Sequence, residues 1–124
     1  MTLNEITKAI VVSLDTHKAR DIRVLDVSGV TSLADRFIIA SGGSTTQVKA
    51  LIDYVETALA AAGVHPLHTE GYNTALWTLL DFGSVVLHVF LESSREFYDL
   101  ERLWQDANVL DTASFLEGDT NEKV

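Results

Sequence analysis

The amino-acid sequence predicts a single α/β domain with a β-sheet of about five strands flanked by helices. Capping signatures precede stripes of apolar residues at helical spacing, and these alternate with short β-branched runs and a candidate hairpin. No repeat or linker divides residues 1–107, so we expect one domain there. Segment 108–124 is acidic and is expected to be a poorly ordered tail, with a docked part around Phe115 and Leu116.

The first part of the chain indicates a helix followed by two strands. Thr2 and Glu5 form a capping-box pattern that would begin a helix over residues 3–17. Its apolar stripe consists of Leu3, Ile6, Ile10, Val11 and Leu14. The β-branched run 21–27 predicts a strand. The nearly continuous apolar run 36–40 predicts a second strand, central in a sheet that is covered on both faces.

A second helix and an edge strand follow. Ser44 and Gln47 form another capping box, and an apolar stripe at helical spacing ends before Gly63, which is well placed as the C-cap residue. Segment 64–69 contains Pro66, the only proline in the chain. Because proline has no backbone N–H to donate to a neighbouring strand, this segment is predicted to be an edge strand.

Two apolar runs, at 75–81 and 85–91, predict a β-hairpin. With a two-residue turn at 82–83, Trp77 would lie opposite His88, on one face of the sheet. A three-residue loop would shift this register by one residue. The sequence therefore predicts the hairpin and leaves its register open.

A last helix is expected after the hairpin. Ser93 and Glu96 form a third capping-box pattern, so we place the start of this helix at Ser93. The predicted apolar stripe consists of Phe97, Leu100, Leu103 and Trp104. Arg95 and Tyr98 fall largely off that stripe.

Composition narrows the classes of function. The 124-residue chain has no cysteine, which excludes disulfides, thiolate metal sites and cysteine nucleophiles. Its net charge of −9 disfavours direct binding of nucleic acid and suits a basic protein partner. No apolar run approaches the roughly 18 residues that a membrane span needs, and the N-terminal residues lack a signal-peptide pattern. We expect a cytoplasmic protein with no membrane segment.

The most enzyme-like motif is the Ser-Gly-Gly-Ser turn at 41–44, between a predicted strand and a predicted helix, where free amides can hold a phosphate. Nucleotidyltransferases place a similar turn before a helix and add a pair of magnesium-binding carboxylates on a following strand. Here Asp81 stands alone, while Asp26 and Asp35 precede the turn. Because two-metal phosphoryl transfer needs several converging carboxylates, we interpret the motif as a turn and helix cap. We predict no catalytic residue and no cofactor.

The histidines do not form a metal-binding pattern. His65 and His68 are three residues apart, but in an extended segment their side chains point to opposite faces. His88 is interpreted as a half-buried strand residue. We predict no metal site.

Two aromatic residues are not easily placed in the predicted core. If Leu76 and Leu80 face the helices, Trp77 lies on the other face of the sheet, near Tyr98 and Arg95. Exposed aromatic rings beside an arginine are typical of the residues that dominate the affinity of protein interfaces. The pattern favours an interface role for Trp77 over a core role.

A series of short motifs runs from residue 21 to residue 104, about two-thirds of the chain. It consists of Asp26-Val27-Ser28, Thr31, Asp35, Phe37-Ile38-Ile39, Ser41-Gly42, Ser44, Glu70-Gly71, Trp77, Leu80-Asp81, Gly83, Val86, His88-Val89-Phe90, Arg95, Phe97-Tyr98, Leu100-Glu101 and Leu103-Trp104. In this order the motifs resemble the RsfS (Iojap) family of ribosomal silencing factors. Two departures are Ser84, where the family usually has an acidic residue, and the tail beyond Ala107.

The resemblance implies a fold and a function. The fold is an α/β domain with a mixed sheet, of nucleotidyltransferase-like topology but without the catalytic carboxylates. The function is binding to the large ribosomal subunit through large-subunit ribosomal protein fourteen. A protein docked there blocks joining of the small subunit and silences translation when nutrients run short. The resemblance also implies that the protein is a homodimer when it is free of the ribosome.

The residues expected to contact the ribosomal protein are Trp77, Asp81, Arg95, Tyr98 and Glu101. Trp77 and Tyr98 are candidate anchors, and Asp81 or Glu101 can pair with basic side chains. Two alternatives remain open. One is a large-subunit biogenesis factor without anti-association activity, and the other is a nucleotide-binding module that uses the turn 42–44 with Asp81.

Overall fold

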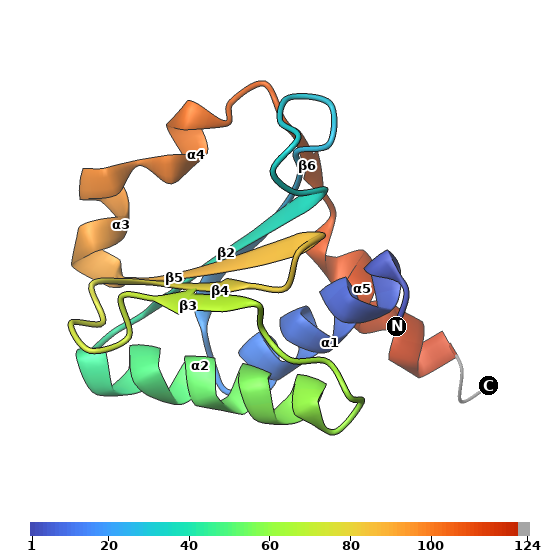
Figure 1. Ribbon diagram of the computed structural model, residues 1–124, viewed down its shortest axis with the longest axis horizontal. Coiled ribbons are helices and arrows are strands. Elements are labelled where there is room, and N and C mark those ends of the chain that lie inside the picture. Colours follow the sequence, from blue (N-terminus) through green and yellow to red (C-terminus); the bar gives the residue numbers. More distant parts are fainter. Residues whose placement is uncertain (122–124) are drawn as a thin grey trace.

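A computed structural model describes residues 1–121 of the chain. The elements in chain order are α1 (Leu3–Thr16), β1 (Arg20–Asp26), β2 (Arg36–Gly42), α2 (Thr45–Ala60), β3 (His68–Glu70), β4 (Trp77–Asp81), β5 (Val85–Leu91), α3 (Glu92–Tyr98), α4 (Leu100–Leu103), β6 (Asn108–Leu110) and α5 (Thr112–Asn121). Helices α1, α2 and α5 lie on one side of the sheet, whereas α3 and α4 lie on the other (Figure 1). The predicted α/β class is confirmed.

Within the described residues, six strands form one sheet in the order β3-β4-β5-β2-β1-β6. β2 and β5 run parallel in the middle, and the other neighbouring pairs are antiparallel, so the sheet is mixed as expected. Every residue of β2 after Arg36 is buried, which confirms that the run 36–40 is a central strand. β3 lies at one edge of the sheet, as predicted for segment 64–69, but it has only three residues and begins after Pro66, which therefore precedes the strand.

Helix α1 begins at the predicted capping box. Glu5 N–H donates to Thr2 Oγ1 at 3.1 Å, and Thr2 N–H donates to Glu5 Oε1 at 2.8 Å. Both terminal amides therefore have partners, which stabilises the first turn by about 1 kcal/mol.

Helix α2 follows its predicted cap only in part. Ser44 Oγ accepts from Gln47 N–H at 3.1 Å, but Gln47 Oε1 accepts from Gly43 N–H instead of completing the box with Ser44. The helix ends at Ala60, with Ala61 as the first non-helical residue. Gly63 then closes the helix as predicted: it adopts a φ of 78°, its N–H donates to the Ala60 oxygen at 2.9 Å, and Val64 N–H donates to the Leu59 oxygen at 2.9 Å.

The hairpin of β4 and β5 has a register two residues away from the prediction. Trp77 pairs with Phe90 rather than with His88. The turn occupies positions 83–84 instead of 82–83, and Gly83 adopts a φ of 90°, which glycine tolerates without strain. Because the shift is even, each side chain remains on its predicted face of the sheet.

The predicted last helix is interrupted. Its N-cap is Leu91, which has no side-chain acceptor, so the predicted capping box at Ser93 and Glu96 is wrong. The helix starts immediately after β5, before Ser93 can serve as a cap. Asp99 then adopts a left-handed conformation, with φ 47° and ψ 49°, and separates α3 from α4.

This break overturns part of the predicted apolar stripe. Phe97 is 81% exposed, whereas Leu100 is buried and Trp104 packs against the same apolar cluster as Leu100. Residues three apart share a face only in a continuous helix, and Asp99 removes that continuity. The side chain of Leu103 lies outside the described residues.

Residues 108–121 do not form the expected poorly ordered tail. β6 pairs antiparallel with β1, and α5 lies beside α1 (Figure 1). Phe115 and Leu116 pack against the core, as expected for a docked segment. The acidic composition of this segment did not indicate β6, a three-residue strand that pairs with the edge of β1. Residues 122–124 of the predicted tail lie outside the described residues.

Two apolar clusters pack on opposite faces of the sheet. The larger one lies under α1 and α2 and is mainly aliphatic, with Leu80 inside it, although Leu76 is 40% exposed rather than facing the helices. The smaller one lies on the side of α3 and α4 and consists of Leu25, Val27, Ala34, Phe37, Ile39, Val86, Phe90 and Leu100. None of the helices in residues 1–121 is long and apolar enough to cross a membrane.

A candidate protein-binding surface

Three aromatic side chains form a surface where α3 meets β4. The ring of Trp77 stacks on Phe90 with centroids 5.1 Å apart, and its centroid lies 5.0 Å from that of Tyr98. Tyr98 in turn meets the edge of Phe97 at 5.3 Å. Tyr98 is 40% exposed and Trp77 is half-buried. We call Trp77, Phe97 and Tyr98 the aromatic surface.

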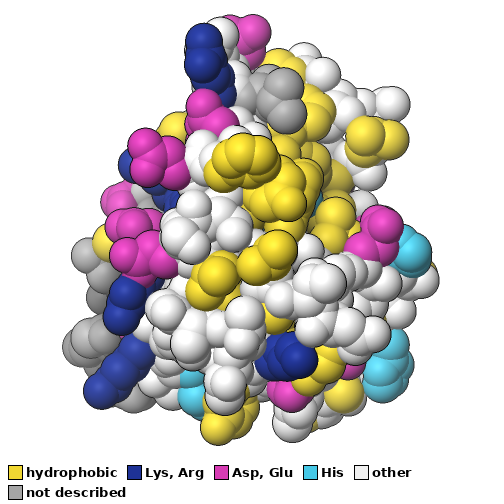
Figure 2. Space-filling model, turned by 90° about the vertical axis from the view of Figure 1, so that its left-hand side faces the viewer, with side chains coloured by type: hydrophobic (Ala, Val, Ile, Leu, Met, Phe, Trp, Pro, Cys, Tyr) yellow, Lys and Arg dark blue, Asp and Glu magenta, His cyan; other side chains and the backbone are white. Residues whose placement is uncertain are grey.

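Local structure explains this placement. Alternate residues of β4 face opposite sides, so Trp77 and Leu79 point towards α3 while Leu80 points towards α2. Figure 2 views the side of the molecule on which α3 lies and shows hydrophobic side chains gathered in its upper half. Charged side chains, mostly acidic, lie along one flank of that patch.

Arg95 holds α3 against the sheet. Its Nη1 donates to the backbone oxygen of Asp21 at 2.6 Å and to Ser41 Oγ at 2.9 Å, and its Nε donates to Glu101 Oε1 at 2.9 Å. Glu101 Oε2 also lies 3.1 Å from Arg23 Nε. The Arg95 side chain is only 12% exposed. The structure therefore joins two predicted site residues to each other, and Arg95 links β1, β2, α3 and α4.

An acidic groove borders the aromatic surface. It has a volume of about 450 Å³ and is lined by Asp21, Arg23, Ser41, Glu92, Arg95, Glu96, Asp99 and Glu101. The carboxylates outnumber the two arginines, which already pair with Glu101. The groove therefore favours positively charged side chains of a partner.

Asp81 lies apart from the other predicted site residues. It is at the far end of β4 from Trp77, and four residues of strand span about 13 Å. Its Oδ1 accepts from Gly83 N–H at 2.7 Å, a bond that stabilises the hairpin turn. The structure thus gives Asp81 a local structural role, and its contact with a partner stays a prediction.

His88 is more deeply buried than its strand position predicted. It is 4% exposed, and its Nδ1 accepts from Trp77 Nε1–H at 3.0 Å. Burial lowers the pKa of His88 to about 4, so the imidazole is neutral at physiological pH. The ring also meets the edge of Phe37 at 4.9 Å between centroids.

The glycine turn before α2 lacks the geometry of a nucleotide site. Gly43 N–H already donates to Gln47, and the Arg20 guanidinium lies 3.0–3.1 Å from where a Cβ of Gly43 would be. Asp81 pairs with Val86, whereas Gly42 pairs with Leu91, five residues further along β5. The carboxylate and the turn are therefore about 16 Å apart along the sheet.

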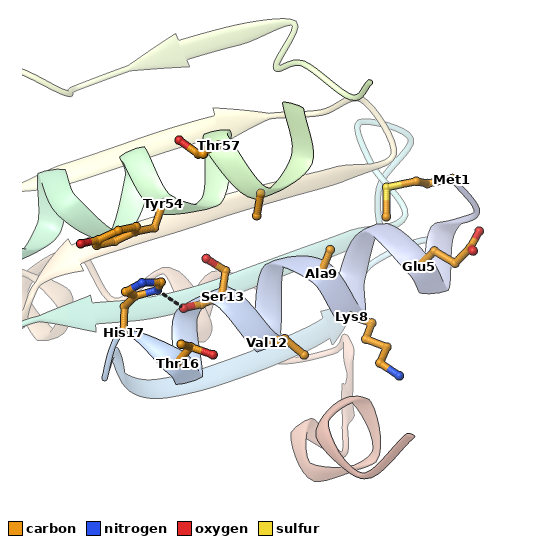
Figure 3. A pocket seen from close by; sticks show the side chains of 11 residues that line it. Met1, Glu5, Lys8, Ala9, Val12, Ser13, Thr16, His17, Tyr54 and Thr57 are labelled. Carbon is orange, nitrogen blue, oxygen red and sulfur yellow. Dashed lines mark hydrogen bonds between the residues drawn. The ribbon is translucent and has the colours of Figure 1, made fainter. Parts of the chain in front are cut away.

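A second hollow lies on the opposite side of the sheet, between α1 and α2 (Figure 3). This groove has a volume of about 650 Å³ and is mainly apolar, with Ala9, Val12 and Ala58 among its lining residues. The rings of His17 and Tyr54 stack at its edge with centroids 3.5 Å apart. It contains none of the predicted site residues. Among the residues whose side chains the structure describes, no three His, Cys, Asp or Glu are grouped so that they could hold a metal ion.

Two site residues escaped the sequence analysis. Phe97 was placed in the core because the sequence contains no clear sign that the helix is interrupted at Asp99. The only hint is that aspartate is one of the residues that adopt the left-handed conformation. The bond between His88 and Trp77 joins diagonal neighbours on adjacent strands. The predicted register also brought His88 close to Trp77, but no signal in the sequence indicated that the imidazole is buried and accepts the indole N–H.

Comparisons with known proteins agree with this architecture. The family model described as "Ribosomal silencing factor during starvation" matches residues 1–123. A ribosomal silencing factor from Chromobacterium violaceum is 44% identical over 104 residues, covering 84% of this chain and 85% of that protein. A mouse protein named "Mitochondrial assembly of ribosomal large subunit protein 1" is 36% identical over 94 residues, covering 73% of this chain and 41% of that protein.

The similarity extends to three-dimensional structure. A crystal structure of a Chromobacterium violaceum protein superposes with a TM-score of 0.82 at 44% identity, covering 85% of this chain and 88% of the other. The family model covers nearly the whole chain, including β6 and α5. The chain therefore belongs to the RsfS family of ribosomal silencing factors.

Proposed function

We propose that the protein binds the large ribosomal subunit through the aromatic surface and sterically blocks joining of the small subunit. Its contact there is large-subunit ribosomal protein fourteen, and the outcome is repression of translation when nutrients are limiting. The observation that carries this proposal is a partly exposed aromatic surface beside an acidic groove, in a member of a ribosomal silencing family.

The physical basis is the chemistry of interface hot spots. Tryptophan and tyrosine bury large areas with little loss of side-chain freedom, and they dominate the affinity of many protein interfaces. Phe97 projects furthest into solvent and adds apolar area next to Tyr98. The net charge of −9 attracts a basic ribosomal protein and accelerates its encounter with this surface.

The predicted site residues have different roles in this proposal. Trp77 and Tyr98 anchor the partner directly. Arg95 and Glu101 hold α3 in position, and Glu101 adds to the acidity of the groove. Asp81 is kept as a candidate for a peripheral ion pair with a lysine or arginine of the ribosomal protein.

The proposal describes a binding protein of the cytoplasm rather than an enzyme. It invokes no cofactor, no metal, no membrane and no direct contact with nucleic acid. The glycine turn serves as a turn and helix cap, because its amide and the space above it are taken by Gln47 and Arg20. When the ribosome is absent, the aromatic surface is a suitable contact for a homodimer.

A second candidate is a large-subunit assembly factor without anti-association activity. The name of the mouse relative, an assembly protein of the mitochondrial large subunit, favours this candidate. Both candidates use the aromatic surface. They differ in whether the protein binds mature subunits and prevents them from joining.

Co-sedimentation tests the proposal. Purified protein is mixed with mature large subunits, small subunits are then added, and joined ribosomes are counted by gradient centrifugation. Binding with fewer joined ribosomes is expected. Binding without that loss would favour the assembly factor, and a failure to bind mature large subunits would contradict the proposed function.

A further inference from the structure

We propose that His88 is a positioning residue for Trp77, and that by accepting the indole N–H inside the protein it leaves only the carbon surface of the indole for a partner. This inference rests on the proposed function, in which the aromatic surface contacts the ribosome. It adds the chemistry of that contact: the patch of the partner that meets Trp77 is apolar and does not need to accept a hydrogen bond from the indole.

The geometry of the two rings supports this role. Trp77 Nε1 and His88 Nδ1 are 3.0 Å apart, a normal hydrogen-bond distance. The tryptophan pairs with Phe90, so His88 lies diagonally across the hairpin, two residues before the pairing partner. Phe90 stacks on one side of the indole while Tyr98 lies against it at 5.0 Å. The N–H therefore points inwards while part of the ring stays exposed.

His88 is itself rigidly held. Its register partners are Ile39 on β2 and Leu79 on β4, and its ring packs against the edge of Phe37. Phe37 in turn meets the edge of Trp104 at 5.1 Å, so a chain of ring contacts runs from beside α4 to the aromatic surface. A donor–acceptor pair supported in this way fixes the orientation of the indole more narrowly than apolar packing alone.

The unpaired nitrogen of His88 indicates why a histidine occupies this position. Because Nδ1 accepts the indole N–H, the proton of the neutral ring is on Nε2. That nitrogen is buried and has no hydrogen-bond partner. A buried N–H without a partner is destabilising, and leucine would occupy similar space without that cost. The acceptor at Nδ1 is the property that leucine lacks.

The test compares His88→Leu with His88→Asn. The two replacements are similar in size, but the asparagine Oδ1 can take the place of Nδ1 as acceptor. The chain has only two tryptophans, so ¹⁵N-labelled protein gives two indole N–H signals, and Trp77→Phe identifies that of Trp77. Affinity for large subunits is measured on the same samples by co-sedimentation.

We expect the Trp77 indole proton to exchange slowly with water in the wild type and in His88→Asn, and rapidly in His88→Leu. We also expect His88→Leu to weaken large-subunit binding about tenfold, and His88→Asn to restore most of that loss. A folded His88→Leu variant with a rapidly exchanging indole proton and wild-type affinity would overturn the inference. If neither variant folds, wild-type protein decides: exchange of the Trp77 indole proton at the rate of a free indole would overturn it.

The failure of this inference is distinguishable from failure of the proposed function. If Trp77→Ala weakens binding but His88→Leu does not, the surface is correct and the positioning role is wrong. If Trp77→Ala binds mature large subunits like the wild type, the proposed use of the surface is wrong, whatever the indole signal shows.

Discussion

The two faces of the sheet are covered in different ways. On one face, α1 and α2 lay long amphipathic stripes over aliphatic strand residues, and residues such as Leu14, Ile52 and Leu59 are fully buried. On the other face, the cover is two short helices separated by Asp99. The side chains beneath and beside these helices include the aromatic rings of Phe37, Phe90, Trp77 and Trp104. The first face is closed by the chain itself, whereas the second leaves Tyr98 and Phe97 in contact with water.

This difference separates residues that hold the fold from residues that meet a partner. Aliphatic side chains packed by long helices stabilise the domain through burial alone. Aromatic side chains that remain partly exposed on a rigid sheet keep apolar area for an outside contact. The groove between α1 and α2 lies on the first face and contains none of the residues assigned to the partner contact.

The largest expected effect is on the closed face. Leu14→Ala should lower the free energy of unfolding by about 4 kcal/mol, because a fully buried leucine leaves a cavity. Urea denaturation followed by circular dichroism measures the change. The folded fraction of this variant should bind large subunits with wild-type affinity. Weaker binding by the folded protein would mean that the two faces are coupled.

The second effect concerns pH and the imidazole of His88, which is buried on the side of α3 and α4. The pKa of His88 is about 4 in the folded protein, against 6.5 for an ordinary histidine. Below pH 6.5 the His88 side chain binds a proton in the unfolded chain, whereas in the folded protein it stays neutral until the pH approaches 4. The stability contributed by neutral His88 is thus complete above pH 6.5, and about 3 kcal/mol is lost by pH 4.

Urea denaturation at several pH values measures this loss. The free energy of unfolding of the wild type, relative to that of His88→Asn, should fall by about 1.2 kcal/mol per pH unit between pH 6 and pH 4.5. The asparagine variant is the control because every other titrating group is common to both proteins. Parallel pH profiles would contradict the neutral, buried state of His88.

The third effect is on binding. Trp77→Ala should keep the fold and weaken binding to large subunits by about 2 kcal/mol or more, because it removes the anchor of the aromatic surface. Sedimentation at increasing subunit concentration gives the dissociation constant. Tyr54→Ala is a matched control, since Tyr54 is a partly exposed aromatic residue on the opposite face. Equal affinities of the two variants would remove the distinction between the faces.

The smallest effect concerns the most exposed aromatic residue. Phe97→Ala should change the free energy of unfolding by less than about 0.5 kcal/mol and weaken binding by about 1 kcal/mol. Leu33→Ala is its control, because Leu33 is similarly exposed and lies outside the aromatic surface. A large loss of stability in Phe97→Ala would instead mean that Phe97 is a core residue, as the sequence pattern predicted.

The elements that sequence reasoning predicted well are those with local signals. The cap at Thr2 and the apolar stripe that follows it predicted α1, and the nearly continuous apolar run 36–40 predicted a strand buried on both faces. Trp77 was assigned to the correct face because strand residues alternate, even though its pairing partner was wrong by two. These patterns are local: the spacing of apolar residues and the chemistry of the helix cap determine the secondary structure within a few residues.

The parts that were missed depend on contacts between distant segments. β6 is stable only because it pairs with β1, and acidic neighbours masked its three residues. The partner contact expected of Arg95 stays a prediction, but its bonds to Ser41 and to the carbonyl of Asp21, more than fifty residues earlier in the chain, were not foreseen. These intramolecular contacts depend on how the folded sheet brings distant segments together, so residue spacing in the sequence does not predict them.

Oxidative footprinting tests the central claim most directly, because it reads both faces in one sample. The free protein and its complex with large subunits are exposed to hydroxyl radicals, and oxidation of individual side chains is measured by mass spectrometry. Our account predicts that Phe97 and Tyr98 become protected in the complex while Met1 and Tyr54, beside the groove of the closed face, do not. Protection of Met1 and Tyr54 with Phe97 unchanged would contradict it.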